Sequence, residues 1–500
     1  MLFQWLGKRY LNMHDCNNSM KKKSLAKNYI YNVFYQILVL ILPLITTPYV
    51  VRVLGPDGTG MYSFTNSVSQ YYILFGCIGL NLYGQREIAF HQNDKRKRSI
   101  IFFELLSVRI CTMLFSIAIF CLTVLQSEKY ALLYKIELLE LVASIFDITW
   151  FFQGMEEFRL IVIRNSIVKI ISVVLIFLLV TTVDDTATYT AILVVTVLIS
   201  NIFMWIYLPK YIQKVTRVEL NPIKHILPMI LLFIPQIATS VYNVLDKTMI
   251  GIITGSDAEV SYYEQAQKIT KMTLSLPAAV GTVMLPRIAN LYGNGDDEEI
   301  KKYIYLSMRF VCMITFPLCF GMIGIARDFV PWFYGYGFDK VYDNFLVISP
   351  IIIFVGISNV LGVQYLLPTN RQNDYTKSVM VGTIFNFIFN LFLIPSLMSV
   401  GAAIGSVIAE GGVTITQLFI LRKLFSIKYF ISIIYKYAIG AFVMLIPIIL
   451  YSNYLGEKSV QDTFVEIIIG IIIYTLYLLI VRDELIKKQV NDIIKLCKGK

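Results

Sequence analysis

Long apolar runs alternate with short polar segments along almost the whole chain, from residue 28 to residue 482. Most runs reach the ~20 residues that a helix needs to cross a ~30 Å hydrocarbon core. Because a segment in lipid must satisfy its backbone hydrogen bonds internally, the pattern predicts transmembrane helices. The fourteen predicted spans cover residues 29–51, 61–83, 100–125, 130–152, 160–182, 187–208, 226–253, 262–286, 303–326, 344–367, 378–397, 402–421, 433–452 and 463–481.

The composition excludes a soluble protein of several domains. Of the 500 residues, 57% are hydrophobic and only 15% are charged, whereas soluble chains average about 25% charged residues. The mean hydropathy is +0.66, and the fold class is predicted to be an all-α polytopic membrane protein. The net charge of +11 is spread over short clusters between apolar runs. Since these clusters do not form one basic face, a nucleic-acid partner is not expected.

The distribution of Lys and Arg among the loops predicts the orientation in the membrane. Cytoplasmic loops of membrane proteins carry the excess of positive charge. Here the basic clusters occupy alternate loops and both chain ends, at residues 8–27, 86–98, 210–224, 422–436 and 482–500. The N- and C-termini are therefore expected to be cytoplasmic, in a multi-pass protein of the bacterial cell membrane.

The two halves of the chain align with an offset of about 200 residues. Leu54–Asp57 falls on Thr254–Asp257, and Ser107–Arg109 falls on Ser307–Arg309. With six spans in each copy, both copies enter the membrane from the same side, so two lobes are expected around an axis along the membrane normal, with a binding site between them. The predicted units are an N-terminal extension (1–27), an N-lobe (28–215), a C-lobe (216–425), two further spans (426–482) and a cytoplasmic tail (483–500).

Several ionisable residues fall inside the predicted spans, where they usually face a bundle interior or a wet cavity. An excess of cations in a central cavity favours an anionic guest such as a phosphate or diphosphate. The candidate substrate-binding residues are Arg52, Arg109, Lys169, Lys247, Lys268, Lys271 and Arg309. The acids are candidates for coupling to H⁺ or Na⁺, and they are Glu137, Glu140, Asp147 and Asp246. In the alternative interpretation the charges neutralise one another, Arg109 with Asp147 and Asp246 with a nearby lysine.

Prolines interrupt the first span of each predicted lobe, at Pro43 and Pro48 and at Pro228 and Pro235. Proline within a helix frees a backbone carbonyl and kinks the helix. Paired kinks suit a bending gate, although each kink is equally compatible with a purely structural role.

Motifs for catalysis and metal binding are absent from the sequence. There is no GxxxxGK[ST] loop, no HExxH or CxxC spacing and no nucleophile with a base in a folded extramembrane region. The chain is therefore not expected to be an enzyme, to bind a metal, or to need a cofactor beyond a coupling H⁺ or Na⁺.

Several short motifs follow one another in order between residues 28 and 420. They are Asn28–Asn32, Arg52–Gly60, Gly84–Ala89, Phe146–Phe158, Leu245–Lys247, Pro286–Ile288, Asn386, Asn390, Pro395, Gly401–Ala403 and Glu410. In their order and spacing the chain resembles the Wzx-type polysaccharide-unit flippases, a branch of the multidrug/oligosaccharidyl-lipid/polysaccharide exporter superfamily. The first span has no arginine before Arg52, which departs from the lipid II flippases of the same superfamily.

The resemblance implies a two-lobed, MATE-like transporter with a cationic cavity that works by alternating access. Its cargo would be undecaprenyl-diphosphate-linked oligosaccharide, moved from the cytoplasmic to the outer leaflet for capsule, exopolysaccharide or O-antigen-type polysaccharide. A polysaccharide polymerase and chain-length machinery would be its protein partners. Two alternatives stay open: a cation-coupled multidrug exporter, which should have an acidic and aromatic lining, and a membrane glycan polymerase or ligase, which should have a large outer loop.

Overall fold

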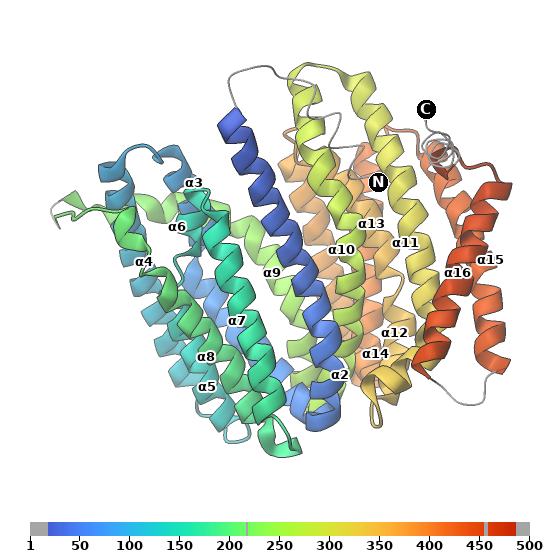
Figure 1. Cartoon of the computed structure of the whole chain (residues 1–500), viewed down its shortest axis with the longest axis horizontal. Helices are drawn as coiled ribbons and strands as arrows, with labels where there is room; N and C mark the ends of the chain where they lie inside the picture. The colour runs from blue at the N-terminus through green and yellow to red at the C-terminus, as the bar shows by residue number, and fades with distance from the viewer. Residues whose placement is uncertain (1–18, 217–218, 455–458, 487–500) are drawn as a thin grey trace.

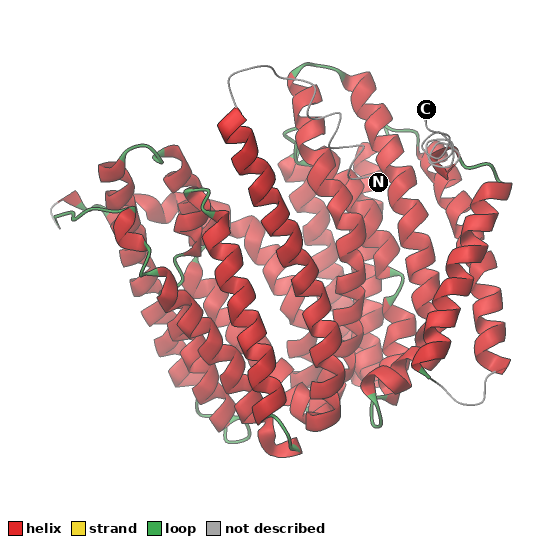
Figure 2. Cartoon of the chain, viewed as in Figure 1, coloured by secondary structure: helices red, strands yellow, loops and turns green. Residues whose placement is uncertain are grey.

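The computed structural model describes residues 19–216, 219–454 and 459–486, and these residues form helices and loops without a strand (Figure 2). The first half of the chain forms the N-lobe, on the left in Figure 1. Its elements are α2 (Ser19–Cys77), α3 (Leu80–Phe90), α4 (Lys95–Thr123), α5 (Ala131–Ile145), α6 (Thr149–Gly154), α7 (Phe158–Leu179), η1 (Val183–Asp185), α8 (Thr186–Met204) and η2 (Leu208–Lys210).

The second half forms the C-lobe, and two further helices follow it on the right in Figure 1. The C-lobe consists of η4 (Pro222–His225), α9 (Ile226–Thr254), α10 (Asp257–Gly293), α11 (Asp297–Tyr334), α12 (Asp339–Ile348), α13 (Ile351–Ser358), η5 (Asn359–Leu366) and α14 (Gln372–Leu421). The added pair is α15 (Ile427–Tyr454) and α16 (Val460–Ile480), and both pack on α11. The start of α2 and the end of α16 lie at the upper end in Figure 1, and the bend of α2 lies at the lower end.

The internal repeat is visible in the backbone. Gly55 breaks α2 with φ 68°, and the aligned Gly255 ends α9 with φ 66°. Only glycine adopts such left-handed angles without a steric cost. Ser256 then accepts a hydrogen bond from the Glu259 amide and caps α10. In both lobes the first helix therefore ends, and the second begins, at the aligned glycine. Pro43 and Pro48 of α2, in contrast, lie within continuous helix.

The predicted spans correspond to helices, with two differences. Among the described residues, ten helices are long and apolar enough to cross a membrane by length and composition. Both α2 and α14 continue from one predicted span into the next across a non-helical residue, Gly55 or Met398. The fourth span, predicted to reach residue 152, ends at Ile145 because the chain turns before α6. The tenth is divided into α12, α13 and the π-helix η5. Residues 1–18 of the expected N-terminal extension and 487–500 of the expected tail lie outside the described residues.

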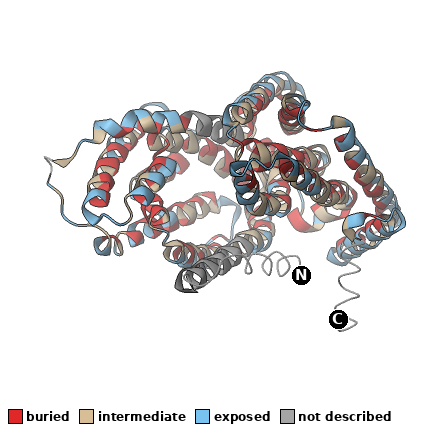
Figure 3. Ribbon diagram, turned by 90° about the horizontal axis from the view of Figure 1, so that it is seen from above, coloured by how far each residue is buried: buried red, intermediate tan, exposed pale blue. Residues whose placement is uncertain are grey.

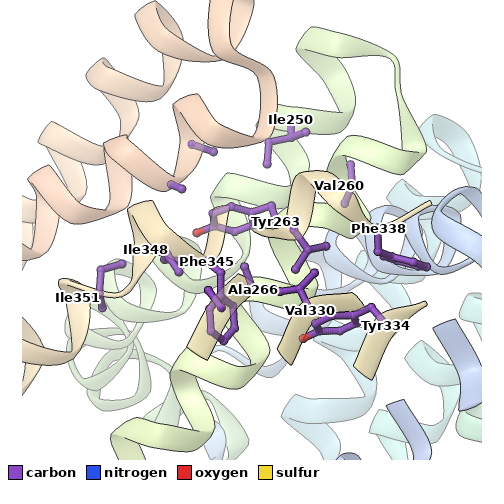
Figure 4. Close-up of a cluster of buried hydrophobic side chains, with 14 of the residues drawn as sticks. Ile250, Val260, Tyr263, Ala266, Val330, Tyr334, Phe338, Phe345, Ile348 and Ile351 are labelled. Carbon is purple, nitrogen blue, oxygen red and sulfur yellow. The ribbon is translucent and has the colours of Figure 1, made fainter. Parts of the chain in front are cut away.

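Apolar side chains fill the interior of each lobe, while many others face outward toward the expected lipid (Figure 3). The C-lobe core joins α9, α10 and α11 with α12 and α14. Figure 4 shows Tyr263 and Ala266 of α10 beside Phe345 and Ile348 of α12. Close packing of this kind holds the polar residues of α9 and α10 in fixed positions.

Candidate functional site

The two lobes meet at the lower end of the molecule, where α2 packs against α10 and α9. The Thr59 and Ser261 hydroxyls are 2.7 Å apart, and those of Ser67 and Thr248 are 3.0 Å apart. A Cβ atom on Gly60 would lie 1.8 Å from the backbone oxygen of Asp257. Such close backbone approach is possible only because residue 60 is glycine.

A second contact between the halves of the chain lies near the upper end, where η4 leads into α9. Glu104 of α4 is fully buried and accepts hydrogen bonds from the Asn221 amide (2.7 Å), Lys224 Nζ (2.8 Å) and His225 Nε2 (2.8 Å). The other ring nitrogen of His225 is 2.8 Å from the Tyr83 hydroxyl. The start of α9 is therefore fastened to the N-lobe, although the rest of this helix belongs to the C-lobe.

Three lysines of the C-lobe gather around one glutamate where α9 and α10 face α2. Lys247 Nζ is 3.0 Å from Glu264 Oε2, and Lys271 Nζ donates to Gln267 Oε1 at 3.0 Å. Lys268 and Glu264 line a small cavity of about 50 Å³ between the lobes. The other polar residues of this cavity are Thr46, Thr47, Thr59, Tyr62, Ser63, Tyr189 and Gln265. Since three lysines surround one carboxylate, this lysine cluster keeps an excess of two positive charges.

Glu264 and Gln267 are not among the site residues predicted from the sequence. A signal for both was present, because residues 264, 267, 268 and 271 follow the three- and four-residue spacing that places side chains on one face of a helix. Lys268 and Lys271 were predicted as charged residues within a span, and this spacing was not used to find their neighbours.

The arginines do not join the lysine cluster. Arg109 is 1% exposed, and its guanidinium donates to Ser144 O at 2.7 Å and Asn81 Oδ1 at 2.9 Å, with Asp147 Oδ2 at 3.6 Å. Arg309, its counterpart in the repeat, pairs with Glu484 Oε2 at 2.6 Å, beyond the end of α16. The neutralising pair of Arg109 and Asp147 is thus present, and Asp147 lies in the turn between α5 and α6.

Arg52 and Lys169 occupy other positions. Arg52 is exposed at the lower end and donates through Nη2 to the backbone oxygen of Trp332, which links α2 to α11. Lys169 is half-buried on α7. Of the seven predicted substrate-binding residues, the structure brings together Lys247, Lys268 and Lys271.

Two of the predicted acids form a carboxylate pair in the N-lobe, facing α2. The Asn66 amide nitrogen is 3.5 Å from Glu137 Oε2 and 3.1 Å from Glu140 Oε2, and Gln70 donates to Glu140 Oε1 at 3.1 Å. Glu137 is fully buried, and its Oε1 atom has no hydrogen-bond partner. The pair is therefore held by neutral amides rather than by a cation.

Asp246 of α9 occupies the interior of the C-lobe and is 2% exposed. Its Oδ1 accepts from Asn386 (2.8 Å) and Asn390 (2.6 Å), and its Oδ2 accepts from the hydroxyls of Tyr263 and Ser406. The adjacent Lys247 pairs with Glu264 and not with Asp246, and Lys271 is the lysine that interacts electrostatically with Asp246. Four neutral donors can hold a buried carboxylate without cancelling its charge.

Comparisons with known proteins agree with this architecture. The model of a family described as "Polysaccharide biosynthesis protein" matches residues 25–292, and a MatE model matches residues 232–396. A protein of Escherichia coli K12 named "Putative O-antigen transporter" is 26% identical over 409 residues, which are 80% of this chain and 98% of that protein. With the apolar helices, these matches show a multi-pass membrane protein.

Solved structures show the same fold. A lipid II flippase MurJ in an inward closed conformation superposes with a TM-score of 0.71 at 16% identity, over 92% of this chain and 100% of that chain. An inward-facing MATE family multidrug resistance transporter gives a TM-score of 0.61 at 15% identity, over 78% of this chain and 94% of that chain. These superpositions show that the chain shares its fold with both proteins.

Proposed function

Because the chain belongs to the polysaccharide biosynthesis protein family, we propose that it is a flippase for lipid-linked oligosaccharide and not an enzyme. Its cargo is an undecaprenyl-diphosphate-linked repeat unit, which crosses from the cytoplasmic to the outer leaflet for capsule, exopolysaccharide or O-antigen-type polysaccharide. The O-antigen transporter of Escherichia coli supports this assignment through its similarity over nearly its whole length. A polymerase and its chain-length machinery receive the repeat unit in the outer leaflet.

The lysine cluster beside the inter-lobe cavity carries the proposal. A diphosphate is strongly anionic, and lysines bind phosphate oxygens as mobile point charges. Lys247 contacts Glu264, and Lys271 contacts Gln267. The diphosphate takes the place of these two groups, so that Lys247, Lys268 and Lys271 become its ligands. The buried Arg109 and the tail-paired Arg309 have structural roles in this proposal.

The lower-end contacts provide one closed gate of an alternating-access cycle. The positive charge of the loops at the upper end makes that end cytoplasmic and the lower end the outer side. Thr59, Ser261 and Gly60 then close the outer side, and the cargo loads from the cytoplasm. Release to the outer leaflet requires these contacts to part.

The buried acids supply sites for a coupling ion. The carboxyl groups of the Glu137–Glu140 pair and of Asp246 accept hydrogen bonds from side-chain amides and take part in none of the ion pairs among the described residues. Binding of H⁺ or Na⁺ at either place neutralises negative charge and shifts the balance between lobe arrangements.

The test is removal of charge from the cluster. In a strain that depends on this gene for surface polysaccharide, Lys268→Gln combined with Lys271→Gln is expected to abolish the polysaccharide while the protein remains inserted at wild-type level. The matched control is Lys301→Gln with Lys302→Gln, which removes two exposed lysines of α11 that pair with Glu298 and Glu299.

Normal polysaccharide in the cluster variant would contradict the diphosphate site. Resistance to cationic drugs or dyes on expression, without an effect on polysaccharide, would instead support a multidrug exporter. Immunoblotting of membrane fractions separates both results from a failure of insertion.

A further inference from the structure

A second pair of buried carboxyl groups lies where α16, one of the two added helices, packs on α11 of the C-lobe. Asp328 of α11 is 1% exposed and Glu466 of α16 is fully buried. The two carboxyl groups interact electrostatically across the contact between α11 and α16. One helical turn further along α11, Trp332 Nε1 donates to the Thr463 hydroxyl of α16 at 2.8 Å, so the two helices are in register at this level.

The oxygen atoms of this pair have no donor. All four carboxyl oxygens of Asp328 and Glu466 lack a hydrogen-bond partner. Ser452 of α15, which is 4% exposed, lies beside Glu466, and its hydroxyl is likewise without a partner. Buried polar groups in native proteins are almost always satisfied, so an oxygen-lined site of this kind points to an occupant.

The charged neighbours on all three helices do not neutralise the pair. On α11, the adjacent Arg327 directs its guanidinium to Asn453 of α15. On α16, Asp462 adds a further negative charge and is engaged in capping Ser459. None of the ion pairs among the described residues includes Asp328 or Glu466. Two ionised carboxylates would therefore face each other in an apolar setting, which is strongly unfavourable.

We propose that Asp328 and Glu466 form a proton-binding site that holds the α15–α16 helix pair on the C-lobe. One bound proton turns the repelling pair into an O–H···O hydrogen bond, and the Ser452 hydroxyl donates to a remaining oxygen. A hard metal ion is the less suitable occupant, because Ca²⁺ prefers six to eight oxygen ligands. These three residues offer five side-chain oxygens, and among the described residues no group of three His, Cys, Asp or Glu could hold a metal.

The proton has a mechanical consequence. The α15–α16 pair packs on α11, and the carboxyl pair lies within that contact. Loss of the proton leaves two adjacent negative charges, which repel each other and draw water into the helix contact. The site lies toward the lower end, so the pH of the outer side governs the attachment if the predicted orientation holds.

The experiment uses the purified full chain in lipid nanodiscs, followed by infrared difference spectroscopy and thermal unfolding between about pH 5 and pH 9. The wild type is expected to show a carboxylic-acid carbonyl band that disappears as the pH rises and is absent in Glu466→Gln. As the pH rises over this range, the melting temperature of the wild type is expected to fall by at least about 2 °C more than that of Glu466→Gln. In this variant an amide replaces the protonated acid. Asp328→Asn is expected to behave like Glu466→Gln.

Glu298→Gln serves as the control, since Glu298 is an exposed carboxylate at the start of the same helix α11. It should retain the band and the pH dependence of the wild type. Equal pH dependence of the melting temperature in the wild type and Glu466→Gln, or a carbonyl region of the difference spectrum that neither substitution changes, would overturn the proposal. Stabilisation of the wild type by Ca²⁺ or Na⁺ that Glu466→Gln abolishes would overturn it in favour of a metal site.

Discussion

Glu264 is the residue that sets the charge of the lysine cluster. Its carboxylate lies 3.0 Å from Lys247 Nζ, and the two side chains are 25% and 13% exposed. Glu264→Gln keeps the shape of the side chain and removes the competing anion. We expect this variant to bind inorganic pyrophosphate more tightly by about 1 kcal/mol, which is roughly five-fold in Kd. Isothermal titration of the purified protein measures the difference.

Gln267→Glu is the opposite change on the same helix face, and it should weaken pyrophosphate binding by placing a second anion beside Lys271. If Glu264→Gln weakens binding instead, Glu264 organises the lysines for the ligand and does not screen them. At this scale the sequence identified the charges and, as one alternative, the Arg109–Asp147 pair, but not the neutral donors around Asp246. Asp147 and Asp246 were equivalent as intramembrane acids, yet one meets Arg109 and the other meets four neutral donors, because pairing depends on which helices pack together.

At the scale of the element, α9 is the helix that both lobes hold. Glu104 holds its start on α4, and Asp246 holds its second half on α10 and α14. Glu104→Ala removes the acceptor of Lys224 and His225 and leaves these donors without a partner in the protein. We expect the variant to lose about 3 kcal/mol of stability and to show a lower melting temperature. Thermal unfolding in nanodiscs checks this.

The control for α9 is Glu219→Ala, which removes an exposed acceptor of the same connecting segment and should leave the melting temperature within about 1 °C of the wild type. An unchanged melting temperature in Glu104→Ala would show that the buried cluster does not secure the helix.

The helices themselves were largely predictable, because the absence of water in the membrane forces every apolar run to pair its own backbone. The early end of α5 and the π-helix η5 were not, because the apolar pattern continues through both interruptions.

For the whole molecule, the repeat predicted two lobes and the structure adds where they touch. The contact at Thr59, Gly60 and Ser261 depends on small residues from two distant segments, and no pattern along the chain predicted that they would meet. If the lobes part at this end in every cycle, a covalent link there must stop transport. We expect Thr59→Cys with Ser261→Cys to form a disulfide, since the native hydroxyls are 2.7 Å apart, and to lose surface polysaccharide under oxidising conditions. Reductant should restore it, and each single cysteine variant should retain it. Transport that continues at full rate with the disulfide formed would mean that the lower end does not open, and the cargo would need a path that leaves these two helices joined.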